Sequence, residues 1–265
     1  MQVKSVLITG TTSGVGRGLL EHYVDRGVKV IAVNRRRVAE LEDRHPAVRF
    51  ECVDVRSAPD VEALIQRMAA AGELPDVFIL NAGINRLDND ETFDLPLYRE
   101  VLDTNLYGVL NFIGPLTQLP PSHVERHIVA ISSVVSQAGN PHGLGYQTSK
   151  KALTTCFDVW SQMYAGTDLV FKQVILGPVP TSIYTMSERL PGWVMWMKGL
   201  ASASLADTVR AIAGFAETRR KTLVHPWRAL AVFGAVRVAR RVIPGFLQGR
   251  RTLQGHPRRP PTTRL

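Results

Sequence analysis

The sequence predicts an α/β domain built on a doubly wound parallel sheet, with helices on both faces. Apolar, strand-like runs alternate with helix-like stretches along most of the chain. The runs are almost continuously apolar, which is typical of parallel strands covered on both faces. The chain has 265 residues and a hydrophobic fraction of 45%, which suffices for one well-packed domain. Right-handed crossovers between parallel strands then place helices on both sides of the sheet.

Short apolar runs rich in valine, isoleucine and leucine mark about seven expected strands. The expected strands are residues 3–8, 28–33, 48–55, 76–80, 126–133, 169–176 and 221–225.

Helices are expected between these strands, and several carry terminal signals. Gly27 and Gly72 end two of them, and the second begins at Ser57, a capping residue with a proline shortly after it. Ser204 is followed three residues later by Asp207, which is close to a capping box. The expected helices are residues 17–27, 57–72, 96–117, 145–166 and 204–219.

The net charge of +9 is unevenly distributed along the chain. Twelve of the 32 Lys and Arg residues lie from Arg219 onward, where the chain has no Asp or Glu. The first 218 residues therefore hold 20 basic and 23 acidic residues and are mildly acidic. Any electrostatic partner should be sought at the C-terminus.

The C-terminal region combines an apolar run with clustered arginines. Residues 229–236 are wholly apolar, and a helix over 227–242 would have 16 residues, too few and too charged to span a bilayer. We expect an apolar-basic amphipathic segment over 226–248 and a disordered basic tail over 249–265. The segment could make a peripheral membrane contact through residues 226–251, cover a substrate pocket or form a dimer contact. No nucleic-acid-binding pattern accompanies the arginines, so no nucleic-acid partner is expected.

Cysteine usage and the start of the chain indicate a cellular compartment. Cys52 and Cys156 form neither a disulfide framework nor a metal-ligand cluster, so no metal site is expected. The chain enters its first strand without a charged-then-apolar leader. Both observations favour the reducing cytoplasm.

A glycine-rich segment, TGTTSGVG at residues 9–16, separates the first strand from the first helix. Ligands of open parallel sheets bind at the carboxyl ends of strands, where glycines let the backbone approach a diphosphate. The N-terminus of the following helix adds free N–H groups and a favourable dipole. The spacing of Gly10, Gly14 and Gly16 differs from the common dinucleotide pattern. The segment predicts a nucleotide site, with a tight strand-to-helix turn as the alternative.

The second strand ends in Asn34, Arg35, Arg36 and Arg37, where the group that contacts an adenosine ribose is expected. An acidic residue there would accept hydrogen bonds from a 2′-hydroxyl, whereas arginine would neutralise a 2′-phosphate. The pattern therefore favours NADP(H) over NAD(H). A solvated basic loop remains the alternative for at least one of the arginines.

Tyr146 and Lys150 lie four residues apart and share one helix face. A neighbouring ammonium favours phenolate, so the pKa of the tyrosine falls from about 10. Such a tyrosine can pass a proton to a carbonyl oxygen that takes up hydride. The alternative is a half-buried tyrosine beside a lysine whose head group reaches solvent.

The glycine segment is followed, in order, by LNAG at 80–83, DTNLYG at 103–108, ISS at 131–133 and YQTSK at 146–150. This series resembles the short-chain dehydrogenase/reductase family over roughly residues 3–225. The resemblance implies a Rossmann fold, with residues 1–225 as the catalytic domain. It also implies NADPH-dependent reduction of a ketone or aldehyde, reversible as alcohol oxidation. An epimerase, another natural-product tailoring enzyme and a non-catalytic dinucleotide-sensing protein stay open as alternatives.

The resemblance implies four catalytic residues. Asn105 would hold a water that leads to the lysine, and Ser133 would hold the substrate oxygen. Ser132 should face the other way on an extended segment. Tyr146 would be the general acid in reduction, and Lys150 would lower its pKa and bind the nicotinamide ribose.

The resemblance also implies the cofactor contacts. Asp54 would bind the adenine and Thr181 the nicotinamide carboxamide, while Leu176 stands where the family usually has a proline. The implied cofactor-binding residues are Gly10, Thr12, Ser13, Gly14, Val15, Gly16, Asn34, Arg35, Arg36, Asp54, Val55, Asn81, Ala82, Gly83, Tyr146, Lys150, Val179 and Thr181.

A substrate lid is expected at about residues 182–203, and it is rich in methionine and tryptophan. Such side chains suit a bulky hydrophobic substrate, such as an acyl chain, polyketide, terpenoid or steroid. They could equally pack the lid onto the sheet or onto a partner subunit. The helices around 96–118 and 145–164 build subunit contacts in relatives, so a homodimer or homotetramer is expected.

Overall fold

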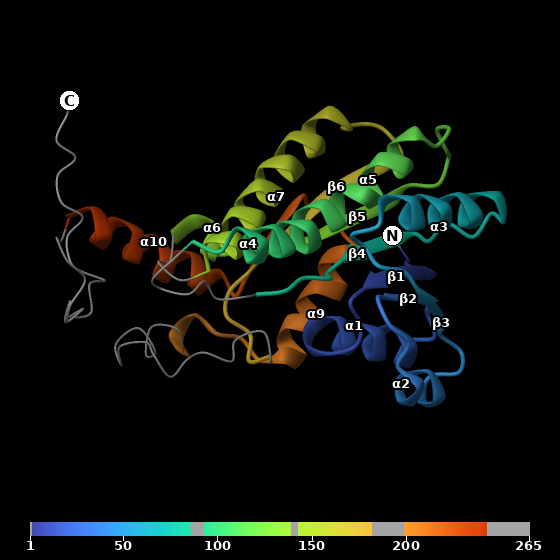
Figure 1. The fold of residues 1–265 in the computed structure, drawn as a ribbon, viewed down its shortest axis with the longest axis horizontal. Coiled ribbons are helices and arrows are strands. Elements are labelled where there is room, and N and C mark those ends of the chain that lie inside the picture. The colour runs from blue at the N-terminus through green and yellow to red at the C-terminus, as the bar shows by residue number, and fades with distance from the viewer. Residues whose placement is uncertain (1, 86–92, 139–142, 182–198, 243–265) are drawn as a thin grey trace, which may run out of the picture.

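The computed structural model describes residues 2–85, 93–138, 143–181 and 199–242 (Figure 1). Within these ranges, seven parallel strands form one sheet in the order β3-β2-β1-β4-β5-β6-β7. The strands are β1 (Ser5–Thr9), β2 (Lys29–Asn34), β3 (Arg49–Cys52), β4 (Val77–Leu80), β5 (Arg126–Ser133), β6 (Leu169–Leu176) and β7 (Thr222–His225). The predicted fold class is therefore confirmed. The chain turns back at β1, so that β4 joins the other side of β1 from β2.

Helices cover both faces of the sheet, as predicted. They are α1 (Gly14–Asp25), α2 (Ala39–Arg44), α3 (Ala58–Ala70), α4 (Leu95–Leu102), α5 (Gly108–Gln118), α6 (Val135–Ala138), α7 (Leu144–Met163), α9 (Leu205–Ala216) and α10 (Trp227–Val242). In Figure 1, α3, α5 and α7 lie above the sheet, and α1 and α9 lie below it.

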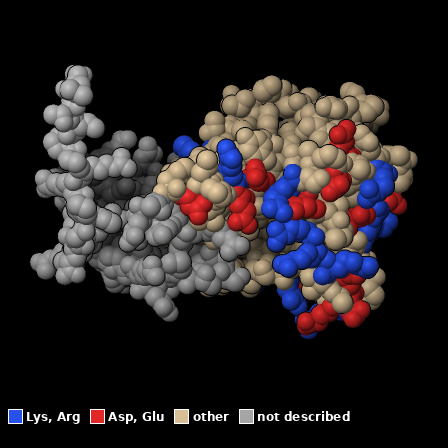
Figure 2. All heavy atoms as spheres, in the orientation of Figure 1, with Lys and Arg blue, Asp and Glu red and all other residues tan. Residues whose placement is uncertain are grey.

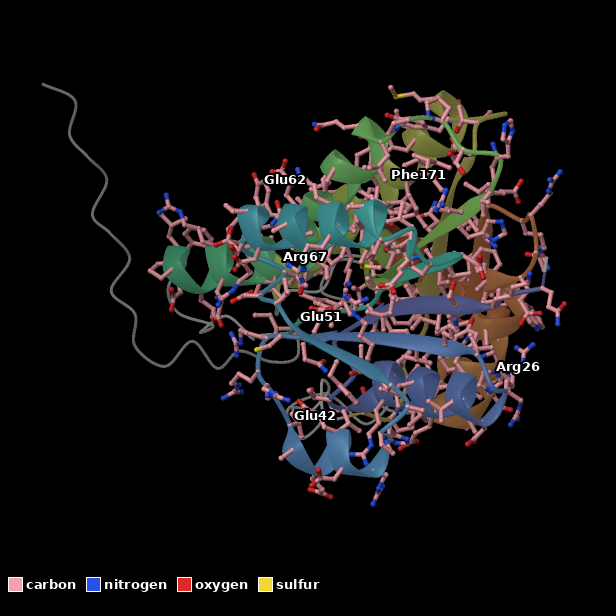
Figure 3. The ribbon with its side chains drawn as sticks, turned by 90° about the vertical axis from the view of Figure 1, so that its right-hand side faces the viewer. Arg26, Glu42, Glu51, Glu62, Arg67 and Phe171 are labelled. Atoms are coloured by element: carbon pink, nitrogen blue, oxygen red, sulfur yellow. The ribbon has the colours of Figure 1, made fainter. Side chains whose placement is uncertain are left out.

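Alternation along the strands produces two separate apolar cores. In β1, Val6 and Ile8 face the core shared with α1 and α9, whereas Leu7 faces the core shared with α3, α5 and α7. In β6, Phe171 (labelled in Figure 3) packs on the second core against Phe157 of α7. Because both faces are covered, the strands carry apolar residues at almost every position.

The helix expected over 96–117 is divided in the structure. Between α4 and α5, residues Asp103–Tyr107 form a π-helical turn, η1. Single π turns inside helices occur frequently at functional sites. Two short helices, α2 and α6, were not expected, because six and four residues are too few to show a helical period. The third strand is shorter than expected, so Asp54 and Val55 lie beyond its carboxyl end.

Most of the expected lid, residues 182–198, and the expected basic tail, residues 249–265, lie outside the described residues. None of the described helices has the length and apolar character needed to cross a membrane. The described residues also contain no group of three or more His, Cys, Asp or Glu that could hold a metal ion.

The two serines expected near helix starts behave differently. The Ser204 hydroxyl accepts a hydrogen bond from the Asp207 backbone N–H at 3.0 Å and so caps α9. Ser57 occupies the capping position of α3, but its side chain makes no capping hydrogen bond.

We expect Ser204→Ala to lower the free energy of unfolding by about 1 kcal/mol, because a bonded cap is lost. Ser57→Ala is the matched control and should change the free energy by much less. Urea unfolding followed by circular dichroism measures both values. Equal losses in the two variants would contradict this account of the caps.

Candidate functional site

A cleft of about 760 Å³ lies at the carboxyl ends of the strands. Its lining comes from the last residues of β2, β5 and β6, from the segments that follow β1 to β4 and β6, and from α4, η1 and the first turns of α7. In open α/β sheets, ligands bind where the strand order reverses, and here this point lies between β1 and β4. The cleft contains every residue predicted from the sequence except Gly16 and Asn105, which lie directly behind its wall.

Two glycines of the segment after β1, Gly10 and Gly16, have no room for a side chain. Gly10 and Gly14 have φ angles of +72° and +55°, in the left-handed region that favours glycine. A Cβ on Gly16 would lie 2.1 Å from the Gly10 carbonyl oxygen. The Asn81 amide donates to the carbonyls of Thr9 at 3.0 Å and Gly10 at 3.2 Å, which ties the segment to the end of β4. The backbone of the glycine segment is thus held close to the end of β4. The N-terminus of α1 is directed at the cleft.

Asn34 supports this segment from the end of β2. Its side-chain oxygen accepts from the Thr11 N–H at 2.8 Å, and its amide donates to the Thr11 hydroxyl at 2.8 Å. The residue lines the cleft but is buried, and its amide is already engaged. The structure therefore gives Asn34 a positioning contact with Thr11.

The three arginines after Asn34 are exposed at the same end of the cleft. Arg37 is held by Glu42 of α2, labelled in Figure 3, with an Nη2–Oε2 distance of 2.6 Å. Arg35 and Arg36 have no carboxylate within 4.0 Å among the residues that the structure describes. Two guanidinium groups thus remain available to an anion.

Asp54 lies beyond β3 at this end, and Arg56 holds its carboxylate. The Arg56 Nε and Nη2 groups donate to the two carboxylate oxygens at 3.0 and 2.6 Å. These hydrogen bonds keep the pKa of Asp54 below its ordinary value. Arg56 also lines the cleft and was not predicted. Its signal in the sequence is only a positive charge two residues after the acid.

The first turns of α7 bring Tyr146 and Lys150 together, as their spacing predicts. The Lys150 Nζ lies 5.7 Å from the centroid of the Tyr146 ring, and both residues line the cleft. Lys150 is only 5% exposed, and its ammonium donates to the Ile131 carbonyl at 2.7 Å. Burial lowers the pKa of Lys150 to about 8.

Asn105 occupies η1 and is fully buried. Its side-chain oxygen accepts from the Ile84 N–H at 2.8 Å, and its amide donates to the Ile84 carbonyl at 2.9 Å. A Cβ on Gly83 would lie 3.2 Å from the Asn105 oxygen and 3.6 Å from the Lys150 Nζ. Asn105 and Lys150 therefore both approach the same glycine behind the cleft.

The two serines at the end of β5 have different partners. The Ser132 hydroxyl donates to the Lys150 carbonyl at 3.1 Å and shares a 2.7 Å hydrogen bond with the Thr154 hydroxyl. Ser133 makes two longer contacts: its hydroxyl donates to the Leu176 carbonyl at 3.3 Å and accepts from the Val135 N–H at 3.4 Å. Ser132 thus fixes α7 on the sheet, which leaves Ser133 as the hydroxyl better placed to bind a ligand.

The segment after β6 closes the site. Leu176, at the position of the family's usual proline, is the last residue of β6, and its carbonyl accepts from the Val134 N–H at 2.9 Å. Val179 and Thr181 line the cleft, and the Thr181 methyl would lie 3.3 Å from a Cβ on Gly14. Leu176 therefore ends β6 as an ordinary strand residue, and the segment after it still contacts the glycine segment through Thr181.

Comparisons with known proteins identify the family of this chain. The pattern of the short chain dehydrogenase family matches residues 4–189. An uncharacterized oxidoreductase of Myxococcus xanthus is 32% identical over 166 residues, which span 58% of this chain and 64% of that protein. The chain thus covers just under two thirds of that relative. The 3-oxoacyl-(acyl-carrier-protein) reductase FabG of Thermotoga maritima is 27% identical over 202 residues, or 72% of this chain and 79% of that protein.

Solved structures show the same fold. A short-chain dehydrogenase from Streptomyces avermitilis superposes with a TM-score of 0.75 and 21% identity, over 91% of this chain and 95% of that one. A short chain dehydrogenase from Burkholderia cenocepacia in complex with NADP gives a TM-score of 0.72 and 22% identity, over 92% and 96%. The chain therefore belongs to the short-chain dehydrogenase family, whose members are oxidoreductases that bind a nicotinamide dinucleotide in a Rossmann fold.

Proposed function

We propose that the protein catalyses the NADPH-dependent reduction of a ketone or aldehyde, reversible as oxidation of the corresponding alcohol. The observation that carries this proposal is the juxtaposition of Tyr146 and a buried Lys150 in the cleft that also contains the glycine segment. Ser133 lines the same cleft. A phenol, a neighbouring cation and a second hydroxyl can together transfer a proton to a carbonyl oxygen and hold that oxygen in place.

The residues present fit a dinucleotide. The close backbone of the glycine segment and the N-terminus of α1 suit a diphosphate. The arginines lie at one end of the cleft and the Tyr146–Lys150 pair lines it as well, so one continuous surface serves both halves of the cofactor. When bound, the nicotinamide supplies or accepts the hydride.

The chain's own groups would handle the proton. Tyr146 donates its hydroxyl proton to the substrate oxygen in reduction and recovers it in oxidation. The Lys150 ammonium favours the phenolate that remains, which lowers the pKa of Tyr146. Ser133 holds the substrate oxygen beside the phenol. Asn105, fixed on the Ile84 backbone, keeps its position behind Lys150.

Arg35 and Arg36 would bind the 2′-phosphate of NADP(H). They are exposed, lie at the edge of the cleft and have no partner carboxylate among the described residues. The related Burkholderia structure is a complex with NADP. Arginine suits a phosphate because its planar fork forms paired charge-assisted hydrogen bonds.

We infer a bulky hydrophobic substrate, acted on by a homo-oligomer in the cytoplasm. The support for the substrate is the Trp- and Met-rich sequence of residues 182–203 and the name of the Thermotoga relative, a 3-oxoacyl reductase. Exposed apolar side chains on α7, such as Val159 and Met163, support a subunit contact there.

Tyr146→Phe should lower kcat/KM for reduction at least about a hundredfold, because the proton donor is removed. Affinity for NADPH should stay within a few-fold, since the ring remains. Steady-state kinetics with a panel of hydrophobic ketones and fluorescence titration with NADPH measure the two effects. The matched control is Tyr164→Phe, at the far end of α7, where the ring packs on Phe171. Full activity in Tyr146→Phe would refute the assignment.

Arg35→Gln and Arg36→Gln should each weaken NADPH binding about tenfold, because a charge-assisted hydrogen bond to phosphate is lost. Binding of NADH should hardly change. Arg37→Gln is the control, because Glu42 already holds that guanidinium. Titration of each variant with both cofactors gives the dissociation constants. If the wild-type protein binds NADH as tightly as NADPH, the preference for NADP(H) is wrong.

A further inference from the structure

Helix α10 is covered by the protein on one side only. On that side Ala229 is fully buried, and Val232 and Phe233 pack against a small core that includes Val134 and Ile175. The helix lies at one end of the molecule, and its outer turns project beyond α6 in Figure 1. One face of α10 is therefore an anchor, and the opposite face points away from the domain.

The opposite face is also apolar, although it is exposed. Trp227, Leu230 and Val238 are 76%, 45% and 62% exposed. At 3.6 residues per turn, the exposed apolar positions fall within an arc of about 140°. We call this arc the outer face; it consists of Trp227, Leu230, Ala231, Gly234, Ala235 and Val238. Clustered exposed apolar side chains of this kind mark a surface that binds a partner.

Arg228 borders the outer face but is tied back to the protein. Its guanidinium donates to the carbonyls of Leu200 and Ser202, both at 2.6 Å. These two hydrogen bonds fix the first turn of α10 on the segment before α9. The orientation of the outer face relative to the domain is therefore set by specific contacts.

The charge of the chain identifies the kind of partner. From Arg237 to the C-terminus the sequence has eight arginines and no acidic residue. The first 218 residues are mildly acidic, and Figure 2 shows basic and acidic side chains interspersed on the described face. An apolar helix face joined to a strongly basic segment matches the interface of a membrane with anionic lipids.

We propose that α10 docks the protein on an anionic lipid surface, with the outer face in the headgroup–acyl boundary. The helix has 16 residues and is about 24 Å long, shorter than the ~30 Å hydrocarbon core. It therefore lies along the interface. Trp227 is well suited to this position, because its ring is apolar and its N–H finds polar partners at the headgroups.

Docking through α10 would hold the candidate site next to the lipid. A Cβ on Gly177, which lines the cleft, would lie 2.8 Å from the Ala229 Cβ and 3.1 Å from Pro226. The cleft and the helix thus share a tightly packed contact. Docking would therefore bring the cleft close to the bilayer, where a lipid-soluble substrate is concentrated. This consequence rests on the proposed function, whereas the docking itself does not.

The test is co-sedimentation of the full-length chain, without cofactor or substrate, with two kinds of vesicle. One kind is phosphatidylcholine alone, and the other contains phosphatidylglycerol as well. We expect binding to the second kind at low salt and weaker binding as salt is raised. Trp227→Ser should reduce the partition coefficient about tenfold, and Val238→Ser several-fold, because less apolar surface enters the interface.

Val124→Ser is the matched control, since Val124 is 50% exposed but precedes β5 at the other end of the sheet. It should leave partitioning unchanged, and thermal unfolding of all three variants verifies that each is folded. Failure of the wild-type chain to bind the anionic vesicles overturns the proposal, as does an equal effect of all three substitutions. A dimer in analytical ultracentrifugation that Trp227→Ser dissociates, without vesicle binding, would show a subunit contact instead. Each of these outcomes leaves the proposed reductase activity untouched.

Discussion

The ammonium group of Lys150 is buried beneath the cleft, and the arrangement of the candidate site depends on this charge. Removing a charge from water is costly unless hydrogen bonds replace its hydration. Because of this cost, burial lowers the pKa of Lys150 to about 8. Among the described residues its one acceptor is the Ile131 carbonyl, at 2.7 Å. An ammonium has three N–H donors, so two remain for a ligand or water in the cleft.

A second buried lysine shows what a purely structural site looks like. Lys172 is 1% exposed, and burial also lowers its pKa to about 8. Its ammonium, however, donates to the carbonyls of Phe215, Ala216 and Thr218 at 2.6, 3.1 and 2.6 Å, which closes the C-terminal end of α9. All of its donors are used within the protein. The two lysines are alike in burial and pKa, and the difference lies in the unused donors of Lys150, which lines the cleft.

Local sequence patterns, namely apolar runs and the glycines that end them, predicted much of the fold. The bounds expected for β5 and β6 and for the helix over 227–242 coincide with those of the structure, because apolar runs and glycine breaks act over a few residues. The features that the sequence did not predict depend on tertiary contacts. The π turn at Asp103–Tyr107 has no sequence period of its own, and Asn34 is engaged by Thr11, 23 residues away. The clamp of Arg56 on Asp54 depends on side-chain geometry that spacing alone does not specify.

The position of the proposed proton-transfer groups follows from the period of strand β5 and the period of helix α7, which meet where Ser132 contacts Lys150 and Thr154. On β5, successive side chains face opposite sides, so Ser132 reaches back to the Lys150 carbonyl and Thr154. That contact fixes α7 against the strand, and the helical spacing then sets Tyr146 and Lys150 on one face. The next residue, Ser133, turns away from these partners. A shift of β5 by one residue would exchange the two serines. The Ser133 hydroxyl and the anchor of the helix that carries the Tyr146 phenol are thus specified together, by adjacent residues of one strand.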